Sequence, residues 1–176
     1  TLTYVTCARV ALEVATADGK RAIGWGETPL SVQWVWPCAL SYEERHEALK
    51  AFCKTLVNAY GSFEYSGHPM EIGHAFLETR LPVLLNEFNA VRKGKEMPWL
   101  AALVCCSAFD IALHDAYGIL HERPVYETYN REWMTCDLSA FITPAADTNL
   151  SFSGKYPADF LNFPRAASLP AWHLMG

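Results

Sequence analysis

The fold of this chain is decided by the stretch Ala108-Phe109-Asp110-Ile111-Ala112-Leu113-His114-Asp115-Ala116-Tyr117-Gly118, together with Arg123-Pro124-Val125-Tyr126 shortly after it. The two stretches predict a buried helix that begins near Pro98 and stops at Gly118, and a second helix that begins at Pro124. The middle of the first helix is rich in alanine and serine, which permits close approach of another helix or of a sheet. This helix is the clearest element of the sequence.

Residues 4–28 predict a β-hairpin that precedes the helices. Apolar residues alternate with charged ones along the first strand, which is typical of a strand with one buried face. The apolar face is formed by Tyr4, Ala8, Val10, Leu12 and Val14. Asp18-Gly19 supplies the turn, and we expect Ile23 and Trp25 to continue the apolar face on the return strand. Because a two-stranded hairpin is marginally stable alone, a third strand or a helical layer must cover it.

Further helices are predicted between the hairpin and the main helix. Ser41 and Glu44 have the spacing of a capping box, which starts a helix that ends at Gly61. Pro69 begins the next helix, and Pro82 must break or kink it because proline lacks an amide hydrogen. The predicted fold class is therefore α+β, an antiparallel β-hairpin or meander followed by a helical bundle.

Composition and charge exclude several classes of protein. The chain has 176 residues, of which 51% are hydrophobic and 19% charged, a composition typical of a globular domain. Its net charge of -5 opposes binding to nucleic acid, and no apolar run approaches the ~20 residues that cross a membrane. The six cysteines lack any zinc-ligand spacing and are typical of small buried side chains in a reducing compartment. We therefore expect a cytoplasmic protein with no nucleic-acid partner and no membrane partner.

The hairpin and the main helix together carry a family resemblance. Gly24-Trp25-Gly26-Glu27 closes the hairpin, and residues 108–118 with Arg123-Pro124-Val125-Tyr126 close the helical bundle. This combination resembles the N-terminal capping domain of the enolase superfamily, in the mandelate racemase and muconate lactonising enzyme group. By this resemblance, residues 1–129 are a capping domain that lacks the family's first strand. Residues 130–176 are the largely irregular connection toward a C-terminal (β/α) barrel, with residues 172–175 as the first strand of that barrel.

The resemblance implies an enzyme whose catalytic centre lies in the missing barrel. In this family the capping domain covers the mouth of the barrel and sets substrate specificity. The barrel holds Mg²⁺ with three acidic ligands and carries a lysine or histidine base. The whole enzyme would remove the proton next to the carboxylate of a small substrate, as an isomerase or a lyase.

A (β/α) barrel needs roughly 200 residues, so the segment is interpreted as a fragment cut at both ends. We expect it to be inactive alone, with no catalytic residue and no metal ligand of its own. Its expected partners are the C-terminal barrel and, in the whole enzyme, a small carboxylate substrate. A homo-oligomer is left open.

Candidates for contact with the substrate lie in the loop formed by residues 31–37. Gln33, Trp34 and Trp36 occupy the position of the family's specificity loop, and large exposed aromatic side chains need a partner. Packing of the tryptophans in the core is the alternative. His173 lies on the expected first barrel strand, from which it would face the barrel mouth.

Two charged patterns near element ends are better explained by structure than by catalysis. Lys93-Gly94-Lys95 has the spacing of the family's bases, but it falls at a charged junction between helix and loop, which favours a solvated face. Glu27 lies at the end of the return strand, where a structural role is favoured over a place on the rim of the active site.

Polar residues on the main helix offer two candidate metal sites. Asp110 and His114 are four residues apart on one face, where a hydrogen-bonded pair is favoured over metal ligation. Asp115 and His121 would complete a zinc-like set with His114, but the predicted stop at Gly118 moves His121 off the helix.

Two other functions stay open beside the capping domain. The chain could be a free-standing binding or assembly module, whose tryptophan loop and C-terminal tail hold a partner protein. It could also be a degenerate, regulatory relative of the enzyme.

Overall fold

The computed structural model describes residues 5–162, 164 and 166–171. The chain divides into two compact units, Thr1–Val125 and Tyr126–Gly176, which are called unit 1 and unit 2 below. Unit 1 contains the hairpin and the helical bundle, in an α+β arrangement. The predicted domain boundary after residue 129 falls four residues beyond the division after Val125.

The N-terminal part of unit 1 is the predicted antiparallel hairpin. Strand β1 (Cys7–Ala15) pairs with strand β2 (Arg21–Pro29), and this pair is the only sheet in the part of the chain that the structure describes. The turn between them contains Gly19 at φ +89°, where its amide donates to the carbonyl of Thr16 at 3.0 Å. Glycine fits here because a side chain would be strained at this positive φ.

The side chains that face inward on β2 differ from the prediction. On β1 the predicted apolar residues Ala8, Val10, Leu12 and Val14 do face inward. On β2, however, Ile23 and Trp25 are 52% and 59% exposed, and the buried positions are Gly24, Gly26 and Thr28. The prediction that Ile23 and Trp25 extend the inner face was therefore wrong. A period of two allows either set of alternate residues to face inward.

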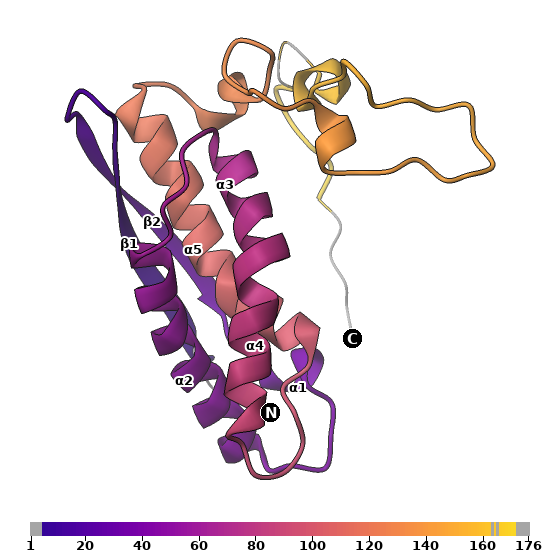
Figure 1. Cartoon of the computed structure of the whole chain (residues 1–176). Coiled ribbons are helices and arrows are strands. Elements are labelled where there is room, and N and C mark those ends of the chain that lie inside the picture. Colours follow the sequence, from indigo (N-terminus) through magenta and orange to yellow (C-terminus); the bar gives the residue numbers. More distant parts are fainter. Residues whose placement is uncertain (1–4, 163, 165, 172–176) are drawn as a thin grey trace. The chain divides into compact units, whose positions relative to one another are not determined.

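The inner face of β2 is occupied by small residues because it lies directly on helix α5 (Trp99–Leu120). A Cβ atom at Gly26 would lie 2.0 Å from the carbonyl oxygen of Ala108, and one at Gly24 would lie 2.1 Å from the amide nitrogen of Ala116. Neither contact is possible, so only glycine allows the two backbones to meet. Figure 1 shows the hairpin along this helix.

The remaining helices pack against α5 away from the hairpin. Helix α2 (Tyr42–Gly61) begins with the predicted capping box, in which the Glu44 amide donates to Ser41 Oγ and the Ser41 amide donates to the Glu44 carboxylate. The core of unit 1 lies between these helices and α5, and its fully buried members include Phe52, Leu56 and Phe76.

The second predicted helix continues through Pro82 instead of ending there. It runs through α3 (Pro69–Ala75), the π-helical turn η1 (Phe76–Arg80) and α4 (Leu81–Ala90) without an interruption in the chain. The wider π turn directly precedes Pro82, where one regular backbone hydrogen bond has no donor. The helical turns therefore continue through the proline with a change in the local helix type, so Pro82 does not break the helix.

Helix α5 also ends later than predicted. Gly118 lies inside the helix and is buried, and the last helical residue is Leu120. A Cβ atom at Gly118 would lie 3.0 Å from the carbonyl oxygen of Arg123, so this glycine permits the chain to fold back closely. The expected helix from Pro124 is a single 3-10 turn, η2 (Val125–Thr128).

Helix α5 is long and apolar enough to cross a membrane by length and composition, which the sequence analysis did not anticipate. Half of its most apolar stretch of 18 residues is buried within the protein, and the hairpin and the helices α1 (Val32–Val35), α2, α3 and α4 pack on it. A single helix of this kind is weak evidence for a membrane span, because a buried core helix has the same length and composition.

Unit 2 consists mostly of turns, as its proline-rich sequence predicts. The regular elements among its described residues are most of η2 and the short 3-10 turns η3 (Leu138–Ala140) and η4 (Pro157–Phe160). The Leu138 amide donates to the carbonyl of Lys155 at 2.8 Å, and the Ala158 amide donates to that of Tyr129 at 3.0 Å. The expected barrel strand at 172–175 lies outside the described residues.

Candidate functional site

The predicted specificity loop contains one helical turn, α1 (Val32–Val35), which directly follows the hairpin. The side chains of Val32 and Val35 are buried in the core of unit 1 and hold the turn against it. Gln33 and Trp34 lie on its opposite side, and the Trp34 side chain is 67% exposed. Gln33 and Trp34, two of the four predicted lid residues, are therefore exposed to solvent on a turn whose other side is buried in the core.

Trp36 does not have the exposed position that the sequence suggested. It is 2% exposed and belongs to the hydrophobic core, which was the alternative considered for this loop. The guanidinium carbon of Arg92 lies 5.0 Å from the centre of its ring, a cation–π distance. Trp36 thus supports the turn that carries Trp34, and its side chain is not available at the surface.

Arg45, which the sequence analysis missed, holds the α1 turn in place. It is buried, and its Nη1 donates to the carbonyl of Trp36 at 2.6 Å while its Nη2 donates to Gln33 Oε1 at 3.5 Å. Its Nε donates to the carbonyl of Ser41 at 3.2 Å. The available signal was its position four residues before Leu49, because a charge on the apolar face of α2 needs buried partners.

The exposed part of this surface can bind but holds no reactive group of its own. Trp34 offers an aromatic face, and the Gln33 amide can donate and accept hydrogen bonds. Such a pair suits contact with an uncharged or aromatic portion of a small molecule. The fourth predicted lid residue, His173, lies outside the described residues.

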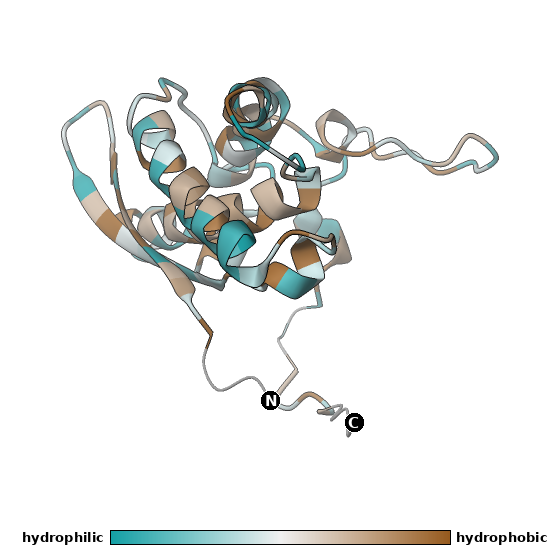
Figure 2. Ribbon diagram, turned by 90° about the horizontal axis from the view of Figure 1, so that it is seen from below, coloured by the Kyte–Doolittle hydropathy of each residue, from teal (hydrophilic) through white to brown (hydrophobic). Residues whose placement is uncertain are grey.

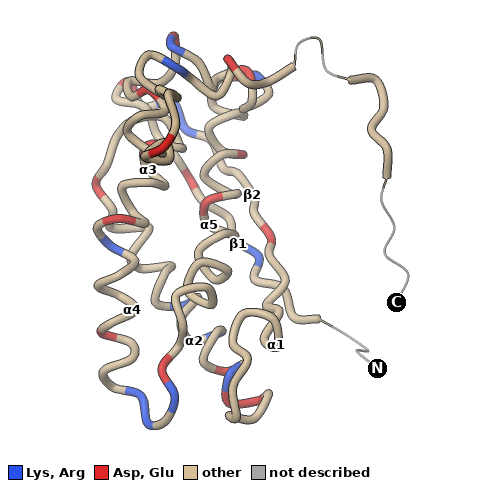
Figure 3. Tube along the Cα trace, turned by 90° about the vertical axis from the view of Figure 1, so that its right-hand side faces the viewer, with Lys and Arg blue, Asp and Glu red and all other residues tan. Residues whose placement is uncertain are grey.

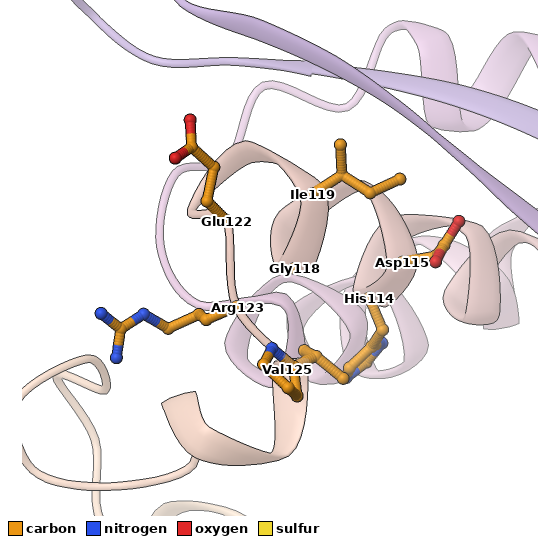
Figure 4. Close-up of a pocket in the computed structure, with 8 residues that line it drawn as sticks. His114, Asp115, Gly118, Ile119, Glu122, Arg123 and Val125 are labelled. Atoms are coloured by element: carbon orange, nitrogen blue, oxygen red, sulfur yellow. The ribbon is translucent and has the colours of Figure 1, made fainter.

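The other candidate region is an open pocket of about 300 Å³ at the C-terminal end of α5. Its lining residues are His114, Asp115, Gly118, Ile119, Glu122, Arg123, Pro124 and Val125. Figure 4 shows that the carboxylate of Glu122 and the guanidinium of Arg123 point away from Asp115 and His114. The charged groups of this pocket do not converge on one point.

The polar groups of the pocket make structural contacts. Asp115 accepts a hydrogen bond from the Trp25 amide at 2.8 Å, and Glu122 lies 3.4 Å from the ammonium group of Lys20. His114 Nδ1 donates to the carbonyl of Asp110 at 2.8 Å, which confirms the predicted hydrogen-bonded pair. Within residues 5–162, 164 and 166–171, no three His, Cys, Asp or Glu side chains are placed to hold a metal ion.

A buried histidine begins helix α3. His68 Nδ1 accepts a hydrogen bond from the Met70 amide at 3.2 Å, and the His68 amide donates to the Glu71 carboxylate at 3.0 Å. Burial lowers the pKa of His68 to about 4, and the nearby charge of His114 lowers it further while Glu71 opposes the shift. His68 is therefore neutral at pH 7, as its role as a hydrogen-bond acceptor requires.

The cysteines of the core have the structural role that their spacing suggested. All six are free thiols, and Cys105 and Cys106 are buried on α5. The Tyr60 hydroxyl lies 3.1 Å from the sulfur of Cys106. Burial raises the pKa of the Cys106 thiol to about 11 and raises that of the Tyr60 hydroxyl as well. Both groups stay protonated at pH 7, and a protonated thiol is a poor nucleophile.

Lys93, Gly94 and Lys95 lie in the exposed loop between α4 and α5, as predicted for a solvated face. Figure 3 shows this loop as a basic segment below α4. Glu27 pairs with Arg9 at 2.7 Å on the outer face of the hairpin, and this hydrogen-bonded pair lowers the pKa of the Glu27 carboxyl.

No protein-family model, curated protein or solved structure matches this chain. The membership of the enolase superfamily therefore stays a prediction that rests on the residues of the chain itself.

Proposed function

We propose that this chain is the capping, substrate-specificity part of an enolase-superfamily enzyme of the mandelate racemase and muconate lactonising group. The complete enzyme acts in the cytoplasm on a small carboxylate and is an isomerase or a lyase. The chain contributes contacts to the substrate and leaves proton abstraction to a C-terminal barrel. The proposal rests on the resemblance of residues 1–129 to the capping domain.

The observation that carries the proposal is the geometry of the α1 turn. Trp34 and Gln33 are exposed, whereas Val32 and Val35 are buried beneath them and Arg45 ties the turn to α2. An exposed tryptophan on an anchored turn offers a large aromatic surface to a ligand or partner. A lid needs this combination, because its contact residues must already be ordered when the substrate arrives.

Among the described residues, no group of three or more His, Cys, Asp and Glu side chains is placed to hold a metal ion. In the complete enzyme the metal would stabilise the negative charge that develops when the proton next to the carboxylate is removed. Under this proposal the metal ligands and the base belong to the barrel.

The first test measures the isolated chain and its uninterrupted reading frame. Calorimetric titration with Mg²⁺ and exchange of the α-proton of carboxylates in deuterated water should both give no signal for residues 1–176. The reading frame should continue for roughly 200 residues or more with spaced acidic residues and a basic strand. Proton exchange by the isolated chain, or a frame that stops near Gly176, contradicts the proposal.

The second test uses the complete protein and a panel of small carboxylates that includes aromatic ones. Replacing Trp34 by alanine should lower kcat/KM for the best substrate by about tenfold, with an unchanged melting temperature. Tyr65→Ala is the matched control, because Tyr65 is an exposed aromatic residue outside the α1 turn. If Trp34→Ala and Tyr65→Ala lowered kcat/KM equally, the α1 turn would have no special role in substrate binding.

A stand-alone assembly module is the second candidate function. The exposed side chains Ile23 and Trp25 on the outer face of the hairpin favour it. Light scattering over a wide range of concentration separates the two candidates. An assembly module should form an oligomer of fixed size with its partner, whereas a severed lid should associate without a defined end point.

A further inference from the structure

Two cysteine thiols meet where helices α2 and α5 pack against each other. Cys53 lies on α2 and Cys105 on α5, and both belong to the hydrophobic packing of unit 1. Figure 2 shows the hairpin at one side of the helices, whereas these two cysteines lie in the contact between helices. Their thiols are free, so a covalent link between the two elements is still to be made.

The sulfur of Cys105 reaches the backbone of α2 one helical turn before Cys53. It donates to the carbonyl of Leu49 at 3.6 Å. Residues four apart share a face of a helix, and a helical side chain points back toward the preceding turn. The Cys53 side chain therefore lies on the face of α2 that Cys105 contacts, and its sulfur is a second hydrogen-bond acceptor for the Cys105 thiol.

The two thiols differ in exposure and in acidity. Cys53 is half-buried, whereas Cys105 is fully buried. The hydrogen bond from Cys105 lowers the pKa of the Cys53 thiol, although burial opposes this shift. The same hydrogen bond, together with burial, raises the pKa of the Cys105 thiol. Cys53 is therefore the sulfur that ionises first and that a small oxidant reaches from solvent.

The neighbouring Cys106 has a different environment. Its sulfur lies 3.1 Å from the hydroxyl of Tyr60, and burial raises the pKa of its thiol to about 11. Successive side chains diverge by about 100° around a helix, so a bond between Cys105 and Cys106 would distort α5. Cys105 is thus the thiol that is placed to react with an oxidised Cys53.

We propose that Cys53 and Cys105 form an oxidation site, at which hydrogen peroxide converts the two thiols into a disulfide that joins α2 to α5. The Cys53 thiolate attacks one oxygen of the peroxide, the O–O bond breaks, and the sulfur becomes a sulfenic acid. The departing hydroxide takes up the proton that Cys53 released and becomes water.

The second step forms the disulfide. The Cys105 sulfur attacks the sulfur of the sulfenic acid, and the S–O bond breaks. The hydroxyl group leaves as water with the proton of the Cys105 thiol. Over both steps the two thiols lose two electrons, and one peroxide molecule is reduced to two water molecules.

The disulfide is reversible and has a mechanical consequence. In a reducing compartment such bonds are usually transient and sense oxidants, because cellular thiols return them to the reduced state. The bond closes residues 53–105, which include α3 and α4, into a covalent loop and so restricts the unfolded chain. The inference does not depend on the capping function, since it uses only residues of the core.

Mass spectrometry of the 176-residue chain tests the proposal. The reduced chain is treated with one equivalent of hydrogen peroxide, its remaining thiols are alkylated, and it is digested. The wild-type chain should lose about two mass units and give a pair of peptides joined through Cys53 and Cys105. Dithiothreitol should separate the two peptides, because it reduces a disulfide but not a sulfinic acid.

Single substitutions separate the two steps. Cys105→Ala removes the thiol that attacks the sulfenic acid, so dimedone, which traps sulfenic acids, should label Cys53 about tenfold more than in the wild type. Cys53→Ala should give no linked peptides. Cys38→Ala is the matched control, because Cys38 is half-buried like Cys53 but lies outside both helices, and it should form the wild-type disulfide. Circular dichroism verifies that each variant is folded.

Three results would overturn the proposal. A wild-type chain that gives no peptides joined through Cys53 and Cys105 would show that the two sulfur atoms cannot bond. A link from Cys53 to Cys106 would make Cys106 the partner instead. Unchanged dimedone labelling of Cys53 in Cys105→Ala would show that the peroxide does not oxidise Cys53 first.

Discussion

The two units of the chain are stabilised in different ways. Unit 1 buries one hydrophobic cluster, in which side chains such as Phe52 and Phe76 are fully removed from water. Unit 2 has short 3-10 turns and few buried side chains, such as Met134 and Leu138, and its turns are joined by hydrogen bonds such as those that Asp137 accepts from the amides of Ser139 and Gly154. Burial contributes more free energy than exposed hydrogen bonds, so unit 2 should open more readily than unit 1.

The largest effect should come from the contact between the hairpin and α5. Gly26→Ala places a Cβ atom 2.0 Å from the carbonyl oxygen of Ala108, and neither backbone can move without separating β2 from the helix. We expect the free energy of unfolding to fall by about 4 kcal/mol, or folding to fail. Urea denaturation followed by circular dichroism measures this change.

Gly61→Ala is the matched control for that substitution. Gly61 is the last residue of α2, and a Cβ atom there would have no neighbour within 4 Å. Alanine favours the helix more than glycine does, so we expect a gain of about 0.5 kcal/mol. A similar loss of stability in both variants would show that the hairpin does not rest on α5 as described.

The second effect concerns the acid stability of unit 1. His68 takes up its proton near pH 4 in the folded chain, because burial lowers its pKa from 6.5. Between these values the unfolded chain binds more protons, so the free energy of unfolding decreases as the pH falls from about 6.5 to about 4. This contribution is complete above pH 6.5 and amounts to about 2 to 3 kcal/mol.

Urea denaturation at neutral pH and at about pH 4.5 measures this loss, with His68→Asn as the comparison. Asparagine can also begin a helix but does not titrate, so the variant should lose less stability on acidification. The difference between the two pH dependences isolates His68 from the neighbouring His114 and His121. An identical pH dependence of both proteins would mean that His68 does not titrate in this range.

Much of the fold of unit 1 could be predicted because its signals are local. The capping box of Ser41 and Glu44 and the helix start at Pro69 depend on neighbouring residues and were predicted correctly. The inner face of β2 depends on a distant contact, and the bulky residues Ile23 and Trp25 suggested the wrong face. Small residues on both β2 and α5 were the available signal, since two backbones can meet only where both partners lack large side chains.

The candidate site was less predictable than the fold, because it also depends on contacts between residues that are distant in the sequence. Sequence patterns selected Gln33, Trp34 and Trp36 together, but they could not separate the exposed Trp34 from the buried Trp36. That separation depends on Arg45 and Arg92, which come from other elements. The continuation of the helix through Pro82 likewise required a π turn, for which the sequence offers no simple pattern.

The smallest predicted effect is local to unit 2. Asp137→Ala removes the acceptor for the amides of Ser139 and Gly154, so both amides should exchange their hydrogens roughly severalfold faster. Hydrogen exchange followed by NMR measures these two sites, and protection of the α5 amides should not change. Asp147→Ala, at an exposed aspartate of the same unit, is the control. If Asp137→Ala also reduced protection along α5, the hydrogen bonds of unit 2 would be coupled to the buried core, and the difference drawn between the two units would be wrong.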